Sequence, residues 1–316
     1  MVRVLSRTYN GPLYQVRIGS SSTNTGTGGT LTDVLKTADG FANVAAQDAA
    51  CGATICTVSI LYDQSGHGNH LKVAPKGGPN GSPTTAEDDY ESSATKGVVS
   101  VGGRQLHSLY TAAHEGYRLA AKGNGMPLGN SDQGIYMLAD GTHSGIPCCF
   151  EFGNVVTNPL TYGISTALFF GTAYWGSGAG AGPWVMADFE AGVWAGGSMP
   201  GDQGWGGLTG TRLPNPNNPS LKVPFALGML KTSSLKYAIR VADLQQTGDL
   251  TTAYDGGSPK APRDWENQGG IVLGVGADNS NNSFGTFYEG AITAGRPSAT
   301  TDTAVLQNIR AVGYGK

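Results

Sequence analysis

Apolar and polar residues alternate along this chain in short runs, and each run is bounded by Gly, Asn, Asp or Pro. An alternation with a period of two is typical of strands that bury one face, and the bounding residues favour turns. The segment Thr57–Asp63 shows the pattern, with Val58 and Ile60 on one face. The other predicted strands are Gly97–Val101, Gly134–Ala139, Cys148–Phe152, Ala167–Gly171, Trp184–Trp194, Val223–Lys231, Lys236–Val241, Leu250–Tyr254, Gly270–Gly276 and Gly285–Thr293.

Two segments have the composition of helices. Ala42–Cys51 is rich in Ala and is followed by Gly52, a residue type that often ends helices. Thr301–Val312 begins with Thr and Asp and carries apolar residues at helical spacing. Many strands and few helices predict an all-β fold, a two-sheet β-sandwich with one or two short helices. We expect a single domain over residues 1–316, in which the Pro- and Asn-rich stretch 208–220 is a surface loop.

Composition narrows the classes of function. The 316 residues include 50 Gly and 16 Pro, while charged residues make up 14% and hydrophobic residues 39%. This chain is too apolar and too weakly charged to be disordered. A net charge of −3 gives no attraction to nucleic-acid phosphates or to anionic lipids. No apolar run reaches the ~18 residues that cross a bilayer, so nucleic-acid and membrane functions are not expected.

The four cysteines form two close pairs. Cys51 and Cys56 enclose a short loop and are able to form a disulfide in an oxidising compartment. The adjacent Cys148 and Cys149 either close a small disulfide ring that can pack on a sugar, or remain two buried thiols, which a generic sequence favours. A zinc site is disfavoured because neither pair has Cys-x₂-Cys spacing. The N-terminus lacks the pattern of a signal peptide, and the cysteine pairs favour a mature secreted protein over an intracellular one.

The segment Gly182–Trp194 holds two nearby acidic residues. If it is one strand, Asp188 and Glu190 share a face with Trp184 and Met186, and the Cα atoms of the two acids lie roughly 6.5–7 Å apart. Carboxylates this close shift each other's pKa values, as in acid/base pairs. The pattern alone favours the alternative that both are ordinary residues on the solvated face of an antiparallel sheet.

A second acidic region is Ile271–Glu289, where Asp278 lies in a polar turn and Glu289 in the strand that follows. A loop Asp just past a strand end is well placed to meet a ligand. The pattern slightly favours an Asx turn instead, in which Asp278 accepts hydrogen bonds from nearby backbone amides. A calcium loop is a weaker alternative, because the downstream acidic ligand is missing.

A polar loop over residues 62–70 contains His67 and His70. Two His on a Gly-rich loop are weak evidence for a metal, and we expect Asp63 and Asn69 to cap this loop. The sequence contains neither a nucleophile elbow nor a phosphate-binding loop, so it gives no support to serine-hydrolase or nucleotide-binding functions.

Five long segments carry a resemblance to a known family: GPLYQVRIGS, AQDAACGATICTVSILYDQSGHGNHL, ADGTHSGIPCCFEFGN, YWGSGAGAGPWVMADFEAGVW and IVLGVGADNSNNSFGTFYEG. From about Leu5 to Tyr314 the chain resembles the catalytic domain of glycoside hydrolase family 54, the α-L-arabinofuranosidases. The resemblance implies a concanavalin- or laminin-G-like jelly-roll sandwich. It also implies an exo-acting enzyme that removes terminal arabinofuranose from arabinan- or arabinoxylan-type glycans with retention of configuration.

The resemblance assigns roles to individual residues. Glu190 aligns with the family's nucleophile and Asp278 with its acid/base. The residues that it places around the sugar are Asp188, the aromatic wall Trp175, the vicinal disulfide of Cys148 and Cys149, and the pocket positions Ala191 and Ala277. With the closeness of Cys51 and Cys56, it favours a second disulfide between them.

Two substitutions depart from the family pattern. Ala191 stands where the family has Asn, which removes a polar contact and leaves galactofuranose or D-arabinofuranose open as the sugar. Ala277 stands where Gly is expected, with little consequence if only its backbone is used.

The family's further N-terminal disulfide and its arabinose-binding β-trefoil are not expected in this chain. We expect a secreted monomer that acts on carbohydrate without cofactor or metal. The alternative from another class is a catalytically silent carbohydrate-binding sandwich.

Overall fold

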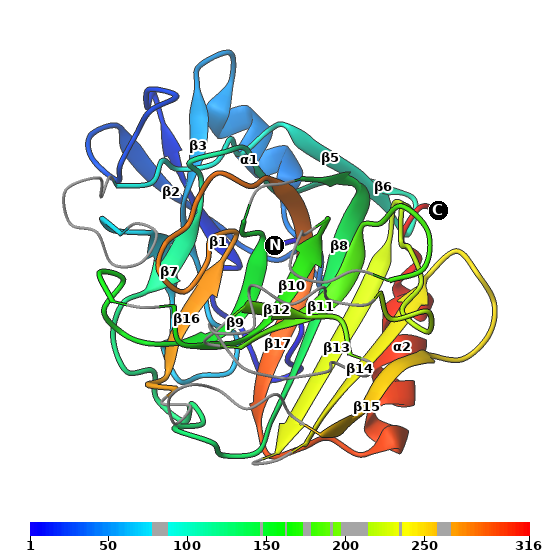
Figure 1. Cartoon of the computed structure of the whole chain (residues 1–316). Coiled ribbons are helices and arrows are strands. Elements are labelled where there is room, and N and C mark those ends of the chain that lie inside the picture. The colour runs from blue at the N-terminus through cyan, green and yellow to red at the C-terminus, as the bar shows by residue number, and fades with distance from the viewer. Residues whose placement is uncertain are drawn as a thin grey trace.

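The computed structural model describes residues 1–77, 88–145, 148–161, 163–172, 178–189, 192–196, 214–233, 236–257 and 267–316. In this part of the chain the short apolar runs form two sheets whose named ladders are all antiparallel, and the sheets pack face to face (Figure 1). The all-β sandwich predicted from the alternating pattern is therefore confirmed. No helix in the described ranges is long and apolar enough to cross a membrane.

The larger sheet has ten strands and carries the candidate site near one of its edges. Strand pairs far apart in sequence meet here, since β9 lies beside β16 and β4 beside β7. In spatial order the strands are β12 (Gly192–Trp194), β11 (Trp184–Phe189), β10 (Ser165–Gly171), β9 (Glu151–Val155), β16 (Gly270–Leu273), β7 (Tyr117–Leu119), β4 (Leu71–Val73), β3 (Cys56–Leu61), β1 (Tyr14–Ile18) and β2 (Thr30–Val34).

The smaller sheet has seven strands, and its long central strands form the other wall of the core. β17 and β8 are paired with two irregularities in register, which bend the ladder. The spatial order is β15 (Thr251–Gly257), β14 (Lys236–Asp243), β13 (Ala226–Ser233), β8 (Gln133–Ser144), β17 (Gly285–Ala294), β6 (Arg104–Thr111) and β5 (Gly97–Val101).

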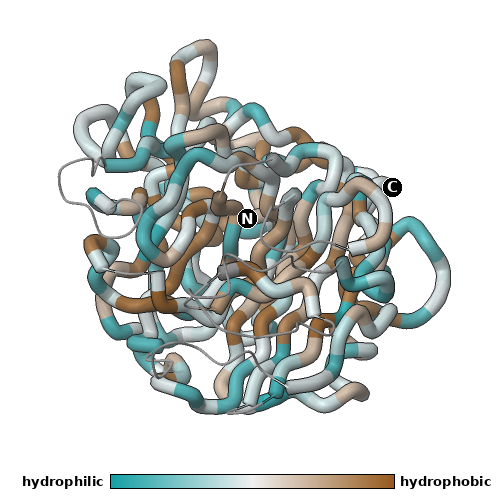
Figure 2. The backbone as a smooth tube through the Cα atoms, viewed as in Figure 1, coloured by the Kyte–Doolittle hydropathy of each residue, from teal (hydrophilic) through white to brown (hydrophobic). Residues whose placement is uncertain are grey.

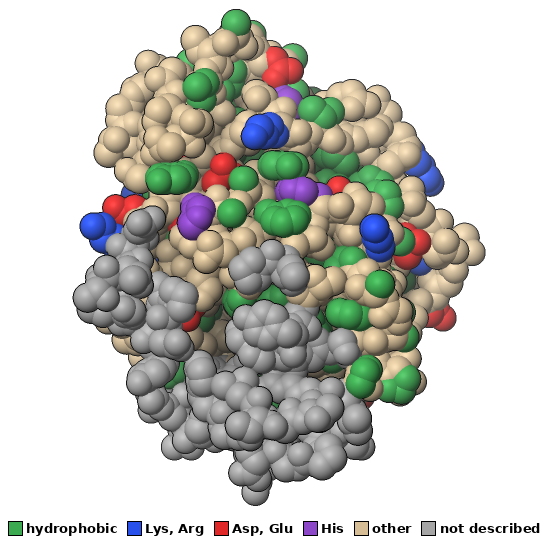
Figure 3. Space-filling model, turned by 45° about the horizontal axis from the view of Figure 1, so that its top comes forward, with side chains coloured by type: hydrophobic (Ala, Val, Ile, Leu, Met, Phe, Trp, Pro, Cys, Tyr) green, Lys and Arg blue, Asp and Glu red, His purple; other side chains and the backbone are tan. Residues whose placement is uncertain are grey.

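The main core lies between the sheets, because one face of each strand alternation is apolar. Phe152 of β9, Leu168 of β10 and Phe189 of β11 face Met137 and Ile239 of the smaller sheet in one buried cluster. In Figure 2 hydrophobic backbone concentrates in the strands of the interior, while many outer loops are hydrophilic. On the face drawn in Figure 3, charged side chains of both signs are scattered among uncharged ones.

Both predicted helices are present. α1 (Val44–Cys51) begins after Asn43, whose side chain accepts a hydrogen bond from the Ala46 amide, and it ends at Gly52 as expected. α2 (Ala299–Val312) begins two residues before the predicted start and is capped by Ser298. Leu306 and Ile309 of α2 pack on the outer face of the smaller sheet (Figure 1).

One predicted strand proves to be two. Within Trp184–Trp194, β11 and β12 are separate antiparallel strands, and Phe189 of β11 pairs with Gly192 of β12. The apolar residues of the two strands gave the same alternating pattern as one continuous strand. Five further strands were not predicted, namely β1, β2, β4, β6 and β7.

Candidate active site

The candidate site lies on the outer face of the larger sheet, over β9, β10 and β11. Alternation along β11 turns Val185 and Ala187 into the core and leaves Met186 and Asp188 on the outer face. Met186 and Trp184 are buried there with Phe169 and Cys149. Asp188 therefore shares its face with Trp184 and Met186, as a strand predicts, and it is half-buried rather than on a solvated face.

Small residues lie beside Asp188 across the three strands. Asp188 pairs with Ala167 of β10, and Ala167 pairs with Gly153 of β9. A Cβ atom at Gly153 would overlap the Cα and Cβ atoms of Ala167 and lie 2.6 Å from the Thr166 carbonyl oxygen. Because Ala167 and Gly153 have little or no side chain, they leave space on the outer face of the sheet. Longer side chains on that face, such as Asp188, can extend into this space.

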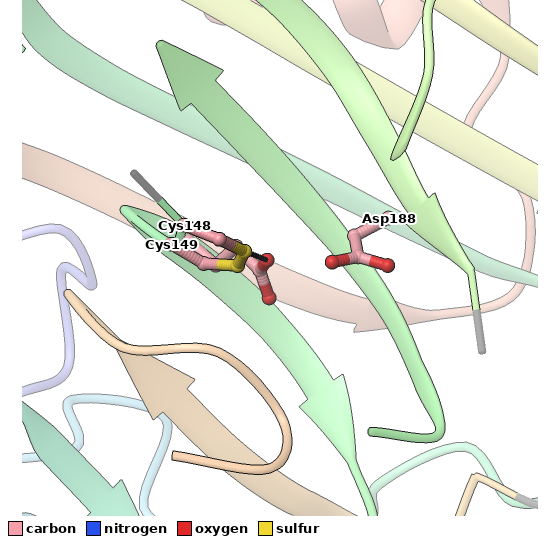
Figure 4. Close-up of side chains that lie close together, drawn as sticks. Cys148, Cys149 and Asp188 are labelled. Carbon is pink, nitrogen blue, oxygen red and sulfur yellow. Dashed lines mark hydrogen bonds between the residues drawn. A yellow bond between two sulfur atoms is a disulfide. The ribbon is translucent and has the colours of Figure 1, made fainter. Parts of the chain in front are cut away.

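The vicinal cysteines and Asp188 face one another in this space. Cys148 and Cys149 are joined by a disulfide just before β9, and Figure 4 shows Asp188 reaching toward them from β11. One ligand-type atom from each of Cys148, Cys149, Glu151 and Asp188 lies within 4.8 Å of the others. Because both sulfurs are bonded to each other, they are not available as thiolates, so this group does not have the donors of a sulfur-containing metal site.

Glu151 is a site residue that sequence reasoning missed. It opens β9, is fully buried, and has its Oε1 atom 4.0 Å from the Cys148 sulfur. Burial raises the pKa of Glu151 well above its usual value, and the charges of Asp188 and Asp278 raise it further, while Arg118 lowers it. An acidic residue inside the otherwise apolar run CCFEFGNVV was the available signal.

Asp278 comes from a loop after β16 and lies near Cys149, since the Asp278 Oδ1 and Cys149 Sγ atoms are each 3.3 Å from the position that a Cβ atom at Gly276 would take. Its Oδ1 atom accepts hydrogen bonds from the Ser280 amide at 2.9 Å and the Ser280 hydroxyl at 2.7 Å. The predicted Asx turn is therefore present, and it coexists with a position near Glu151. The turn holds one carboxylate oxygen in place, so the direction of the Asp278 side chain is defined.

The buried carboxyl group of Asp89 holds the Asp278 loop in place. Asp89 accepts hydrogen bonds from the side-chain amides of Asn279, at 3.1 Å, and Asn281, at 2.5 Å. Burial raises the pKa of Asp89 to about 7. Asn279 adopts a left-handed backbone with φ of 63°, a conformation that Asn tolerates better than most residues.

Arg118 of β7 supplies positive charge beside the acidic group. It is buried, and its guanidinium donates to the Ala277 carbonyl at 2.9 Å and the Val156 carbonyl at 2.6 Å. Burial lowers its pKa to about 10, against the opposing effect of Asp278, Asp89 and Glu151. Ala277 therefore contributes its backbone carbonyl to this hydrogen bond, and its place in the sugar pocket remains a prediction.

Three residues expected at the site, Glu190, Ala191 and Trp175, lie outside the described residues. Their predicted roles remain predictions.

Glu289 has a structural role in another part of the molecule. It lies in β17 of the smaller sheet, buried in a bidentate ion pair with Arg3 at 2.6 and 2.7 Å. The Tyr314 hydroxyl donates to the same carboxylate at 2.7 Å. These donors stabilise the buried Glu289 carboxylate, so its burial is explained without a catalytic role.

The loop that contains His67 and His70 is capped as expected. Asp63 accepts hydrogen bonds from the Ser65 and Asn69 amides at 2.8 and 3.0 Å, and its own amide donates to His70 Nδ1 at 3.0 Å. His70 therefore stabilises the loop as an acceptor.

Fold and site together define the class of the protein: an antiparallel β-sandwich with an acidic, partly buried site on the outer face of one sheet. The sequence pattern of the family described as alpha-L-arabinofuranosidase B, catalytic, matches residues 1–315. The chain belongs to this family.

Relatives and solved structures agree with this assignment. The chain is 38% identical over 99% of its length to an arabinofuranosidase/B-xylosidase of Trichoderma koningii and to a probable alpha-L-arabinofuranosidase B of Aspergillus clavatus. It spans 59% and 58% of those two proteins. A family 54 arabinofuranosidase soaked with a cyclic sulfate inhibitor superposes with a TM-score of 0.85 at 35% identity, covering 99% of this chain and 62% of that one. An arabinofuranosidase complexed with arabinofuranosyl-alpha-1,2-xylobiose matches with the same TM-score and identity, over 99% and 61%.

Proposed function

We propose that this chain is an exo-acting, retaining α-L-arabinofuranosidase of arabinan- or arabinoxylan-type glycans. The observation that carries the proposal is that Asp188 and Asp278, from distant parts of the sequence, both lie beside the vicinal disulfide. A carboxyl oxygen of Asp188 lies within 4.8 Å of both sulfurs. The Asp278 Oδ1 and Cys149 Sγ atoms each lie 3.3 Å from the position that a Cβ atom at Gly276 would take. The resemblance assigns Asp188 to sugar binding and Asp278 to acid/base catalysis. Membership of the family and the similar structures with arabinofuranosyl ligands support the same substrate class.

The proposed reaction has two steps. In the first, the Glu190 carboxylate attacks the anomeric carbon, the glycosidic bond breaks, and Asp278 gives its proton to the departing oxygen. In the second, Asp278 takes a proton from water, the water oxygen attacks the anomeric carbon, and Glu190 is released. Two displacements on one carbon return the original configuration.

The described residues suit the remaining tasks. Asp188 is positioned to accept hydrogen bonds from sugar hydroxyls, and the disulfide of Cys148 and Cys149 offers a compact apolar surface next to it. Arg118 partly balances the negative charge of the acidic group. We propose that Trp175 forms the aromatic wall and that Ala191 and Ala277 line the pocket. The disulfide between Cys51 and Cys56 supports an oxidising, extracellular location, and we propose that the protein acts there as a monomer.

The test compares leaving groups in two variants. Glu190→Gln should abolish turnover of every furanoside, because the attack on carbon is needed whatever departs. Asp278→Asn should slow an unactivated arabinoside by roughly 10²–10⁴-fold. It should spare the first step with a nitrophenyl arabinofuranoside and give a burst of phenol followed by slow turnover. NMR of the first-formed sugar should show the α configuration.

Glu289→Gln is the matched control, because Glu289 is a buried acid outside the site and its loss should leave the leaving-group dependence unchanged. A panel of aryl furanosides, with a xyloside included, identifies the sugar. Binding of arabinofuranosides without release of phenol would refute the enzymatic proposal and favour a carbohydrate-binding sandwich. Equal losses on both substrates in Asp278→Asn, without a burst, would refute the acid assignment.

A further inference from the structure

Glu151 is a buried acid at the site to which the proposed reaction gives no task. Its side chain is fully buried, and Oε1 lies near the Cys148 sulfur, which has no hydrogen to donate once it is in a disulfide. Within the described part of the chain, Oε2 meets no hydrogen-bond donor. An ionised carboxylate in this position would therefore be buried without a hydrogen bond, which costs several kcal/mol.

The charged groups that face Glu151 come from three elements. Asp188 of β11 has a carboxyl oxygen within 4.8 Å of it, and the charges of Asp278, from the loop after β16, and of Arg118, from β7, also act on it. The Arg118 hydrogen bonds that the structure shows go to backbone carbonyls. The carboxylates of Asp188 and Asp278 would repel an ionised Glu151, and only the Arg118 guanidinium would attract it. The ionised form of Glu151 would therefore be repelled more than it is attracted.

A proton shared between the Glu151 and Asp188 carboxyl groups removes the repulsion between them. Asp188 and Glu151 have carboxyl oxygens within 4.8 Å of each other. Two ionised carboxylates in contact repel, whereas a neutral acid next to an ionised one donates a strong hydrogen bond to it. Glu151 is the more buried of the two, and the neutral form belongs on the more buried group.

We propose that Glu151 is a neutral carboxylic acid that donates its proton in a hydrogen bond to Asp188, and so orients the Asp188 carboxylate toward the hydroxyl groups of the bound furanose. Glu151 acts through Asp188 and is a positioning residue. The proton stays on the pair throughout turnover. The proposal rests on the sugar-binding role of Asp188 in the proposed function.

The experiment compares Glu151→Gln with Glu151→Ala. Gln keeps the length of the side chain, is neutral and still donates to Asp188, so kcat/KM for a nitrophenyl arabinofuranoside should stay near the wild-type value. Ala removes the donor, and kcat/KM should fall roughly tenfold to a hundredfold, mainly through a higher KM, since a hydrogen bond to a charged group has about that effect. The infrared difference spectrum between the wild type and Glu151→Gln at neutral pH should contain the carbonyl band of one protonated carboxyl group, that of Glu151; the contribution of Asp89, whose pKa is about 7, is common to both proteins and cancels.

Glu91→Gln is the matched control. Glu91 is also a buried acid, but it forms an ion pair with Arg17 at 3.0 Å. Its replacement should lower Tm without changing KM or the infrared band.

Two results would overturn the proposal: a Glu151→Gln variant that is folded but as impaired as Glu151→Ala, or an infrared spectrum in which Glu151→Gln loses no protonated-carboxyl band. The infrared result stands even if Glu151→Ala fails to fold. It also stands if the chain hydrolyses no furanoside. The protonation of Glu151 and the proposed enzymatic function are therefore tested independently.

Discussion

Gly153 offers a direct test of how the sheet builds the site. Gly153→Ala adds one methyl group that overlaps the Cα and Cβ atoms of Ala167 and crowds the Thr166 carbonyl oxygen. These are mainly atoms of the paired strand, which cannot rotate away as the end of a long side chain can. β9 and β10 must therefore move apart.

The magnitude follows from two opposing effects. An inserted methylene in a close-packed region costs about 1–3 kcal/mol, and the lower conformational entropy of unfolded Ala offsets about 0.5–1 kcal/mol of that. The net loss should be about 1–2 kcal/mol, and Tm should fall by about 2–8 °C. The displacement of β9 also moves Glu151 relative to Asp188, so kcat/KM on an aryl arabinofuranoside should fall as well.

The assays are thermal unfolding and steady-state kinetics, with Gly257→Ala as the matched control. Gly257 is also a strand glycine, and a Cβ atom there meets no atom within 4 Å. Its Tm should be unchanged or slightly higher. A Gly153→Ala variant with wild-type Tm and wild-type kcat/KM would show that the strands tolerate the methyl group and that the close approach does not shape the site.

Three further predictions concern other parts of the molecule. Trp175→Ala should reduce activity far more than stability, since we expect a wall residue; a loss of about 3–5 kcal/mol in unfolding free energy, typical of a core Trp, would contradict this. Mass spectrometry of the non-reduced protein should find no free thiol among the four cysteines, and four alkylated cysteines in the native protein would argue against both disulfides. The third prediction is a pH dependence from Asp89. Its folded-state pKa of about 7 lies above its unfolded value, so its contribution to stability is complete below about pH 4 and is lost as the pH rises to about 7. Asp89→Asn should flatten this part of the plot of Tm against pH, and a variant with the wild-type slope would refute the assignment.

Much of the fold could be predicted because it depends on local patterns. Strands such as Gly97–Val101 were predicted with their bounds, since alternation and flanking turn residues act within a few positions. The end of α1 at Gly52 follows from the backbone freedom of one residue. Two of the unpredicted strands, β4 and β7, are only three residues long, too short for a period-two pattern to be recognised. β7 becomes a strand only through its pairing with β16 and β4.

The sequence by itself determined the sandwich class, the two helices, the family resemblance, and Asp188 and Asp278 as candidates. Tertiary structure alone decided that Asp188 and Asp278 both lie beside the vicinal disulfide, and that Glu289 of the other sheet pairs with Arg3. It also decided that β11 and β12 are two strands, because the pairing of Phe189 with Gly192 is a contact that alternation does not encode. The physical reason is the same in each case: a side chain's pKa and partners depend on burial and on neighbours from distant segments, and these exist only when the sheets have formed.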